Sequence, residues 1–249
     1  YSMDLEKLVI DFSWKEKDIN LFLPIVIALT GFIFYWFSAQ SKKIKAYFID
    51  KYEADQASIN HILFTKYMGL FFMGIFPCVV CLILLPEYSL ADYGIYIEPK
   101  TCITSLLWIL ILSIVVIPIV SYSARQPKNL ENYPQIRAKE WNLKLKFKNA
   151  LGWAFYLLGY EILFRAILLF PLYYELGLWP AIAINTALYS ATHIPKGLDE
   201  TLGAIPLGIV LCILTLITNT IWVAFIIHVL MAWTNSFTAL KHHPNMKSI

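Results

Sequence analysis

Four ionisable side chains stand inside apolar segments of this chain, and their types suit hydrolysis. Glu161 and Arg165 lie in the stretch YEILFR, within the apolar run GWAFYLLGYEILFRAILLFPLYY, and His193 and His228 lie in later apolar segments. Ionisable residues inside membrane segments are rare and usually mark function. One carboxylate and two imidazoles can activate a water molecule and stabilise the oxyanion that develops. Because Arg165 lies one helical turn after Glu161, we expect it to keep the carboxylate charged and oriented.

Two other interpretations fit the same four residues. Glu161 and Arg165 could form a structural ion pair that holds the helices together, with His193 and His228 as satisfied core residues. Carboxylates and histidines also build proton paths, which would make the protein a proton-coupled transporter. The first, second, third and sixth apolar segments contain no further acidic residue, and this argues against a relay.

The composition excludes a soluble protein. Hydrophobic residues make up 59% of the 249 residues and charged residues only 15%, whereas soluble domains are nearly half apolar and about a quarter charged. We therefore expect an integral membrane protein with an all-α, polytopic fold. The partners expected from this composition are membrane lipids, and no nucleic acid.

About seven segments are apolar enough to cross the membrane, since a span needs about 20 mostly apolar residues. They are residues 20–39, 63–86, 102–122, 150–173, 178–195, 202–218 and 220–240. The fifth is the weakest, because Asn185, Thr186 and His193 interrupt it. The last two are joined only by residues 218–220 and should form an antiparallel hairpin. We predict a single helical membrane domain over residues 1–249.

The distribution of lysine and arginine predicts the orientation, because cytoplasmic loops carry more of both. The connections after the first and third segments hold eleven of them: Lys42, Lys43, Lys45, Lys51, Arg125, Lys128, Arg137, Lys139, Lys144, Lys146 and Lys148. The opposite side holds four: Lys7, Lys15, Lys17 and Lys100. We therefore predict the N-terminus outside and the C-terminus in the cytoplasm. We also expect the membrane to be a bacterial inner membrane. Lys66 should lie at the cytoplasmic end of the second segment and extend towards water.

The connection over residues 123–148 ends in EWNLKLKFKNA, where Trp141, Leu143, Leu145 and Phe147 alternate with polar or basic residues. Such a pattern is typical of an anchor at the surface of an anionic membrane. It could also be a docking surface for a substrate, and the sequence does not separate the two.

Three short motifs in the later segments resemble those of a known family. They are Tyr160-Glu161-Ile-Leu-Phe-Arg165, Tyr189-Ser-Ala-Thr-His193 and His228-Val-Leu-Met-Ala232. Their order and spacing resemble the CPBP family (CAAX proteases and bacteriocin-processing enzymes, also called Abi), whose motifs are EExxxR, an aromatic residue followed by xxxH, and HxxxN. The resemblance covers residues 130–240, a CPBP-like core, and implies an intramembrane protease.

The chain departs from the family pattern at two positions. Tyr160 stands where the family has its catalytic carboxylate, and Ala232 stands where it has an asparagine. Alanine cannot donate a hydrogen bond to an oxyanion. Glu161 could act as the base and Tyr160 could donate a hydrogen bond. Asn235 lies seven residues after His228, on the same helix face, and could supply the missing amide.

The hypothesis that follows is a CPBP-like intramembrane endopeptidase. In it Glu161 and His193 activate water, His228 stabilises the oxyanion, Arg165 orients Glu161, and a peptide or membrane-protein segment enters from the cytoplasmic half. The alternative is a catalytically degenerate relative that binds a partner as a scaffold, chaperone or immunity protein. If a metal such as zinc is present, its ligands would be Glu161, His193 and His228. We favour a metal-free site, because the histidines lie on different segments and lack HExxH spacing.

Overall fold

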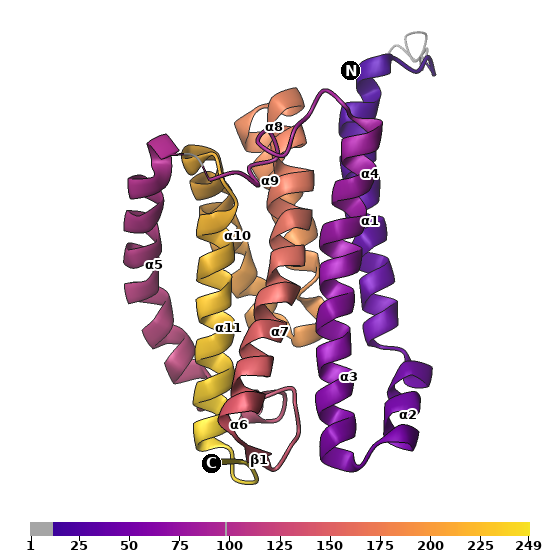
Figure 1. The fold of residues 1–249 in the computed structure, drawn as a ribbon. Helices are drawn as coiled ribbons and strands as arrows, with labels where there is room; N and C mark the ends of the chain where they lie inside the picture. The colour runs from indigo at the N-terminus through magenta and orange to yellow at the C-terminus, as the bar shows by residue number, and fades with distance from the viewer. Residues whose placement is uncertain (1–11, 98) are drawn as a thin grey trace, which may run out of the picture.

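The computed structural model describes residues 12–97 and 99–249 and is a bundle of helices (Figure 1). Among these residues, six helices are long and apolar enough to cross a membrane. They are Glu16–Ala39, Ala54–Leu84, Pro99–Ser123, Leu143–Leu176, Leu198–Thr218 and Trp222–His242. The predicted all-α membrane fold is confirmed, and the expected number of about seven is close to the six found.

Over residues 12–97 and 99–249, the bundle is built in chain order from eleven labelled helices and one small strand pair. The first half comprises α1 (Ile19–Ala39), α2 (Lys42–Lys51), α3 (Ala54–Gly69), α4 (Phe76–Leu84), α5 (Cys102–Ser123) and α6 (Pro127–Leu130). The second half comprises α7 (Leu143–Glu161), α8 (Phe170–Leu176), α9 (Leu178–Ala191), α10 (Leu198–Thr218) and α11 (Trp222–His242). The strands β1 (Glu140–Trp141) and β2 (Lys247–Ser248) pair in parallel and attach the C-terminal segment to the start of α7.

Two long helices are continuous through π-helical turns. Residues Leu70–Ile75 join α3 to α4, and residues Ile162–Leu169 join α7 to α8. A π-helical turn changes which side chains share a face, and such turns are frequent at functional sites. The second π-helical turn begins directly after Glu161, the last residue of α7, and Arg165 lies within it.

The predicted segment 178–195 forms a helix too short to cross a membrane. Helix α9 has 14 residues, or about 21 Å at 1.5 Å per residue, against about 30 Å of hydrocarbon. Glycines with positive φ precede and follow it, Gly177 (79°) and Gly197 (106°), and only glycine adopts these values without strain. His193 therefore lies in the turn between α9 and α10 and not inside a span.

The predicted hairpin between the last two helices is confirmed. Asn219 ends α10 in the left-handed conformation (φ 52°), and α11 begins three residues later at Trp222. A hydrogen bond to the connection between α4 and α5 stabilises this turn: the backbone N–H of Ile221 donates to the carbonyl of Gly94 at 3.0 Å.

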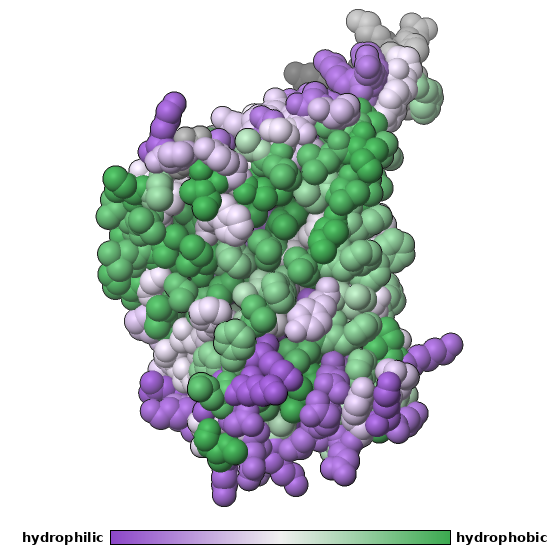
Figure 2. Space-filling model, viewed as in Figure 1, coloured by the Kyte–Doolittle hydropathy of each residue, from purple (hydrophilic) through white to green (hydrophobic). Residues whose placement is uncertain are grey.

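The start of the described residues and the C-terminus lie at opposite ends of the bundle (Figure 1). Figure 2 shows a broad hydrophobic band between two hydrophilic ends, and α2 and β1 lie at the C-terminal end. Both basic connections of the sequence therefore meet at one end of the bundle. Lys7, one of the basic residues counted for the other side, lies outside the described residues.

A close approach of α3 and α7 fixes the position of the site. A Cβ added to Gly159 would lie 2.7 Å from the carbonyl oxygen of Gly69, and one added to Gly74 would lie 3.0 Å from the Cα of Gly159. Small residues allow helix backbones in membranes to approach in this way. Gly159 directly precedes Tyr160 and Glu161, so this contact sets the depth of both side chains.

Two predictions about the surface were wrong. Lys66 does not extend towards water: it is 4% exposed, and its Nζ lies 2.8 Å from the centre of the Trp153 ring, where the ring face attracts the cation. Of the predicted anchor residues, Trp141 is fully buried and donates to the carbonyl of Ala138 at 3.0 Å, and Leu145 is also buried, so both are core residues and not surface anchors. Leu143 and Phe147 are exposed, as an anchor or a docking surface would need.

Candidate active site

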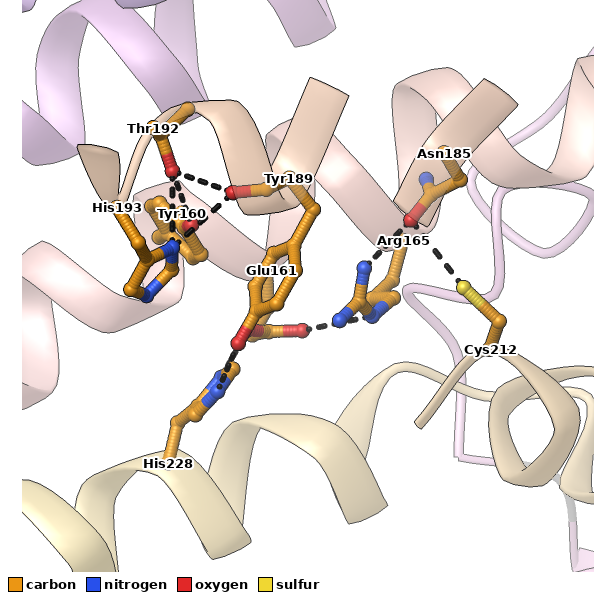
Figure 3. Close-up of polar contacts among 9 residues, drawn as sticks. All are labelled: Tyr160, Glu161, Arg165, Asn185, Tyr189, Thr192, His193, Cys212 and His228. Carbon is orange, nitrogen blue, oxygen red and sulfur yellow. Dashed lines mark hydrogen bonds and ion pairs between the residues drawn. The ribbon is translucent and has the colours of Figure 1, made fainter. Parts of the chain in front are cut away.

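The carboxylate of Glu161 is enclosed between two partners. It is fully buried and accepts a hydrogen bond from Nδ1 of His228 on α11 (Figure 3). Its other oxygen lies 3.4 Å from Nε of Arg165, which is also fully buried. Removing two charges from water is costly unless they are paired and hydrogen-bonded, and this pairing explains how the bundle tolerates both.

Helix α9 completes the surroundings of Arg165. Its Nη1 donates to Oδ1 of Asn185 at 2.7 Å, and the guanidinium lies 4.7 Å from the centre of the Tyr189 ring. The thiol of Cys212 on α10 reaches the same amide oxygen at 3.2 Å. Arg165 thus connects α7, α9 and α10 around a single cation.

Both ring nitrogens of His228 are engaged. A carboxylate can only accept, so Nδ1 carries the hydrogen that Glu161 accepts. Nε2 lies 3.0 Å from the hydroxyl of Tyr189 and accepts from it when the imidazole is neutral. Glu161, His228 and Tyr189 therefore form a hydrogen-bonded chain from the buried ion pair towards the turn after α9 (Figure 3).

His193 has a different arrangement. Its Nδ1 lies 3.1 Å from the carbonyl oxygen of Tyr189. A carbonyl can only accept, so Nδ1 carries the hydrogen and Nε2 of the neutral ring keeps a free lone pair. The hydroxyl of Thr192 donates to the same carbonyl at 2.7 Å, and it is therefore the acceptor in its 2.8 Å contact with the Tyr160 hydroxyl. Tyr160 is thus a hydrogen-bond donor at the position where the family has a carboxylate.

A cavity of about 330 Å³ opens beside these residues. Four of the predicted site residues line it, namely Tyr160, His193, His228 and Asn235, together with Tyr189 and Ala232. Glu161 and Arg165 do not line it, although they support His228 and Tyr189 from behind. The volume lies at the lower end of the range for ligand sites.

The mouth of the cavity carries two opposite charges. Lys196 and Glu200 line it, with Nζ and Oε2 3.8 Å apart and side chains 40% and 44% exposed. Ser123, Asn129 and Tyr133 also line it, and they belong to the end of α5 and the connection that follows. The cavity therefore reaches the end of the bundle where the basic connections lie.

The structure brings the predicted residues together in a different pairing from the one expected. Glu161 contacts His228 and Arg165, and among the described residues no hydrogen bond joins it to His193. The Tyr189 ring lies against both histidines, with ring centres 4.9 Å from His193 and 6.0 Å from His228. Glu161 is thus placed to hold His228, and His193 faces the cavity without a carboxylate partner of this kind.

The proposed metal ligands do not fit a metal ion. A catalytic zinc site needs three protein ligands around an open position. In the described part of the chain, no three His, Cys, Asp or Glu side chains are grouped closely enough to hold an ion. His228 also has both of its nitrogens committed to protein partners. The residues present therefore give no basis for a step through a metal.

Sequence reasoning missed several residues of this site. Asn185 was noticed only as an interruption of an apolar segment, yet it holds the guanidinium of Arg165. Its burial inside such a segment is the signal that could have identified it, because buried amides need partners. Glu200 gave no signal, since it lies in a polar turn between two apolar segments.

The fold and the motif helices define a helical membrane protein with a buried Glu–Arg–His constellation beside a cavity. Residues 147–234, 88 of the 249, match the family model described as Type II CAAX prenyl endopeptidase Rce1-like. The resemblance drawn from the motifs is confirmed over this segment, and the chain is a helical membrane protein in which residues 147–234 are similar to the Rce1-like CAAX protease family. Searches of curated proteins and of solved structures gave no match.

Proposed function

We propose that the protein is an intramembrane endopeptidase that hydrolyses a peptide bond in a membrane-associated peptide or protein, with His193 as the general base. One observation carries this proposal: His193 lines the cavity while its Nδ1 is held at the carbonyl of Tyr189. This contact leaves Nε2 unprotonated in the neutral ring, and a general base needs such a nitrogen within reach of its water.

The reaction needs a base, an oxyanion donor and a proton for the leaving amine. His193 takes one proton from water, and the hydroxide attacks the carbonyl carbon of the scissile bond. For the tetrahedral oxyanion to accept a hydrogen bond from His228, Nε2 must gain a proton and release the Tyr189 hydroxyl, while Nδ1 keeps its contact with the Glu161 carboxylate. The proton on His193 then passes to the leaving nitrogen as the C–N bond breaks.

Three further residues support this reaction. Asn235 lies two turns after His228 and lines the same cavity, so its amide is placed as a second oxyanion donor at the site that Ala232 leaves without one. Arg165 keeps Glu161 charged, and Tyr160 holds Thr192 in the turn that carries His193. A substrate would reach the cavity from the end with the basic connections, which we propose is the cytoplasmic side of a bacterial inner membrane.

The second candidate function is a binding protein that no longer cleaves. Tyr160 and Ala232 favour it, because neither has the chemistry of the family residue at its position, and Glu161 does not line the cavity. Such a protein would hold an apolar peptide or membrane-protein segment in the cavity as a scaffold, chaperone or immunity factor.

One experiment separates the two functions. The purified protein in lipid nanodiscs is incubated in H₂¹⁸O with a pool of synthetic peptides that carry an apolar segment, and the products are analysed by mass spectrometry. A peptidase gives new C-termini that carry ¹⁸O with the wild type and with His242→Asn, an exposed control histidine, but not with His193→Asn. A photoreactive residue at position 232 that captures intact peptides, with no ¹⁸O in any product, would establish the binding protein instead.

A further inference from the structure

The cavity contains one carboxylate that no part of the mechanism has used. Among the residues that line the cavity, Glu200 is the sole Asp or Glu. It lies in the first turn of α10, seven residues after His193 in the chain, and both residues line the same space of about 330 Å³. The family's carboxylate position, by contrast, is occupied by Tyr160.

The Glu200 side chain is available to the cavity. Its closest charged neighbour in the described chain is Lys196, whose Nζ is 3.8 Å from Oε2, too far for a hydrogen bond. Burial raises the pKa of the Tyr133 phenol, and the Glu200 charge raises it further. Tyr133 lines the same cavity as Glu200.

The surroundings of His193 favour an anion nearby, because His193 becomes positively charged when it takes a proton and a lysine already lies in the same turn. His193 is faced by Lys196 from its own turn, by Tyr160 from α7 and by His228 from α11. The buried carboxylate of Glu161 is already balanced by Arg165. Without Glu200, a proton gained by His193 would face a lysine with no compensating charge in the cavity, and like charges raise the cost of that step.

We propose that Glu200 supplies the catalytic carboxylate that position 160 lacks. The inference rests on the proposed peptidase function. Glu200 accepts a hydrogen bond from the second hydrogen of the water whose first hydrogen passes to Nε2 of His193. It stabilises the imidazolium until His193 returns the proton to the leaving amine.

The neighbouring residue provides a matched control. Asp199 also lies in the first turn of α10, but it is exposed, pairs with Lys128 at 2.7 Å and does not line the cavity. Glu200→Gln should lower kcat by about 100-fold, in the range that general acid–base groups contribute, whereas Asp199→Asn should leave it unchanged. The acid limb of the pH–rate profile should move to lower pH in Glu200→Gln, because the imidazolium has lost its anion.

A double variant excludes a merely structural role. If Glu200 acts only as the partner of Lys196, then Lys196→Met combined with Glu200→Gln restores the wild-type rate. If Glu200 is catalytic, the double variant stays about as slow as Glu200→Gln. Wild-type hydrolysis with an unaffected Glu200→Gln variant, or a rescued double variant, overturns this assignment alone. Absence of hydrolysis by the wild type overturns the peptidase function and this role together.

Discussion

Replacing Glu161 with glutamine removes the one carboxylate within 4 Å of Arg165 in the described structure. Leaving a buried charge without its partner costs about 3–5 kcal/mol. Arg165 keeps its 2.7 Å contact to Asn185 and its place over the Tyr189 ring, so the lower end applies, about 3 kcal/mol. At about 2–4 °C per kcal/mol for a chain of this size, the midpoint of thermal unfolding should fall by about 6–12 °C.

The assay is thermal and SDS-induced unfolding in mixed micelles, followed by circular dichroism. Glu131→Gln serves as the control, because Glu131 is an exposed carboxylate in the connection before α7. Combining Glu161→Gln with Arg165→Met should recover most of the loss, since a neutral pair of similar size replaces a buried ion pair at little cost. The glutamine oxygen can still accept from His228, so hydrolysis should persist at a rate reduced by about tenfold.

The refuting result is the opposite pattern. If Glu161→Gln unfolds at the wild-type temperature while hydrolysis is abolished, then Glu161 is the base and the pairing with His228 and Arg165 is not its main role. If the double variant loses as much stability as the two single changes added together, the two side chains are not coupled as the 3.4 Å contact requires.

Three further changes test other parts of the structure. Gly159→Ala should destabilise the protein by about 1–3 kcal/mol through overpacking, because the added Cβ would lie 2.7 Å from the Gly69 carbonyl oxygen. Gly203→Ala serves as the control and should not destabilise the protein, because no atom lies within 4 Å of a Cβ added there. An equal loss in both would contradict the close helix contact. Lys66→Met should leave thermal stability unchanged or raise it by about 1 kcal/mol, since a buried charge is replaced by an apolar chain of similar volume, and a marked loss would show that its ring contacts are needed. Tyr160→Phe should reduce the rate less than tenfold, because Tyr160 donates and is not the base; a loss as large as that of a missing base would refute this.

Hydropathy predicted the membrane fold because the free energy of burying about 20 apolar residues dominates every other term. It failed at residues 178–195, where local backbone geometry decides the outcome. Gly177, with a positive φ, directly precedes α9, the helix ends at Ala191 ahead of Pro195, and no window average records either boundary. The hairpin between α10 and α11 was predictable, because a three-residue connection allows no other arrangement of two long apolar helices.

The sequence predicts which residues belong to the site better than it predicts which of them contact each other. Unsatisfied charges are costly in apolar surroundings, so Glu161, Arg165 and the two histidines can be recognised in the sequence as exceptions within apolar segments. Which histidine meets the carboxylate depends on the π-helical turn after Glu161 and on the Gly159 contact, and both are tertiary features. Glu200 was hidden for the same reason, because a carboxylate in a polar turn is ordinary until the turn is seen to line a cavity.

The most direct test of the catalytic role of His193 is its tautomer. ¹⁵N NMR of the protein labelled at histidine, in lipid nanodiscs, with His193→Asn used to assign the signal, reports which ring nitrogen carries the hydrogen. The contact to the Tyr189 carbonyl predicts a hydrogen on Nδ1 and an unprotonated Nε2 at neutral pH. A hydrogen on Nε2 of the neutral ring would contradict the assignment of His193 as the base.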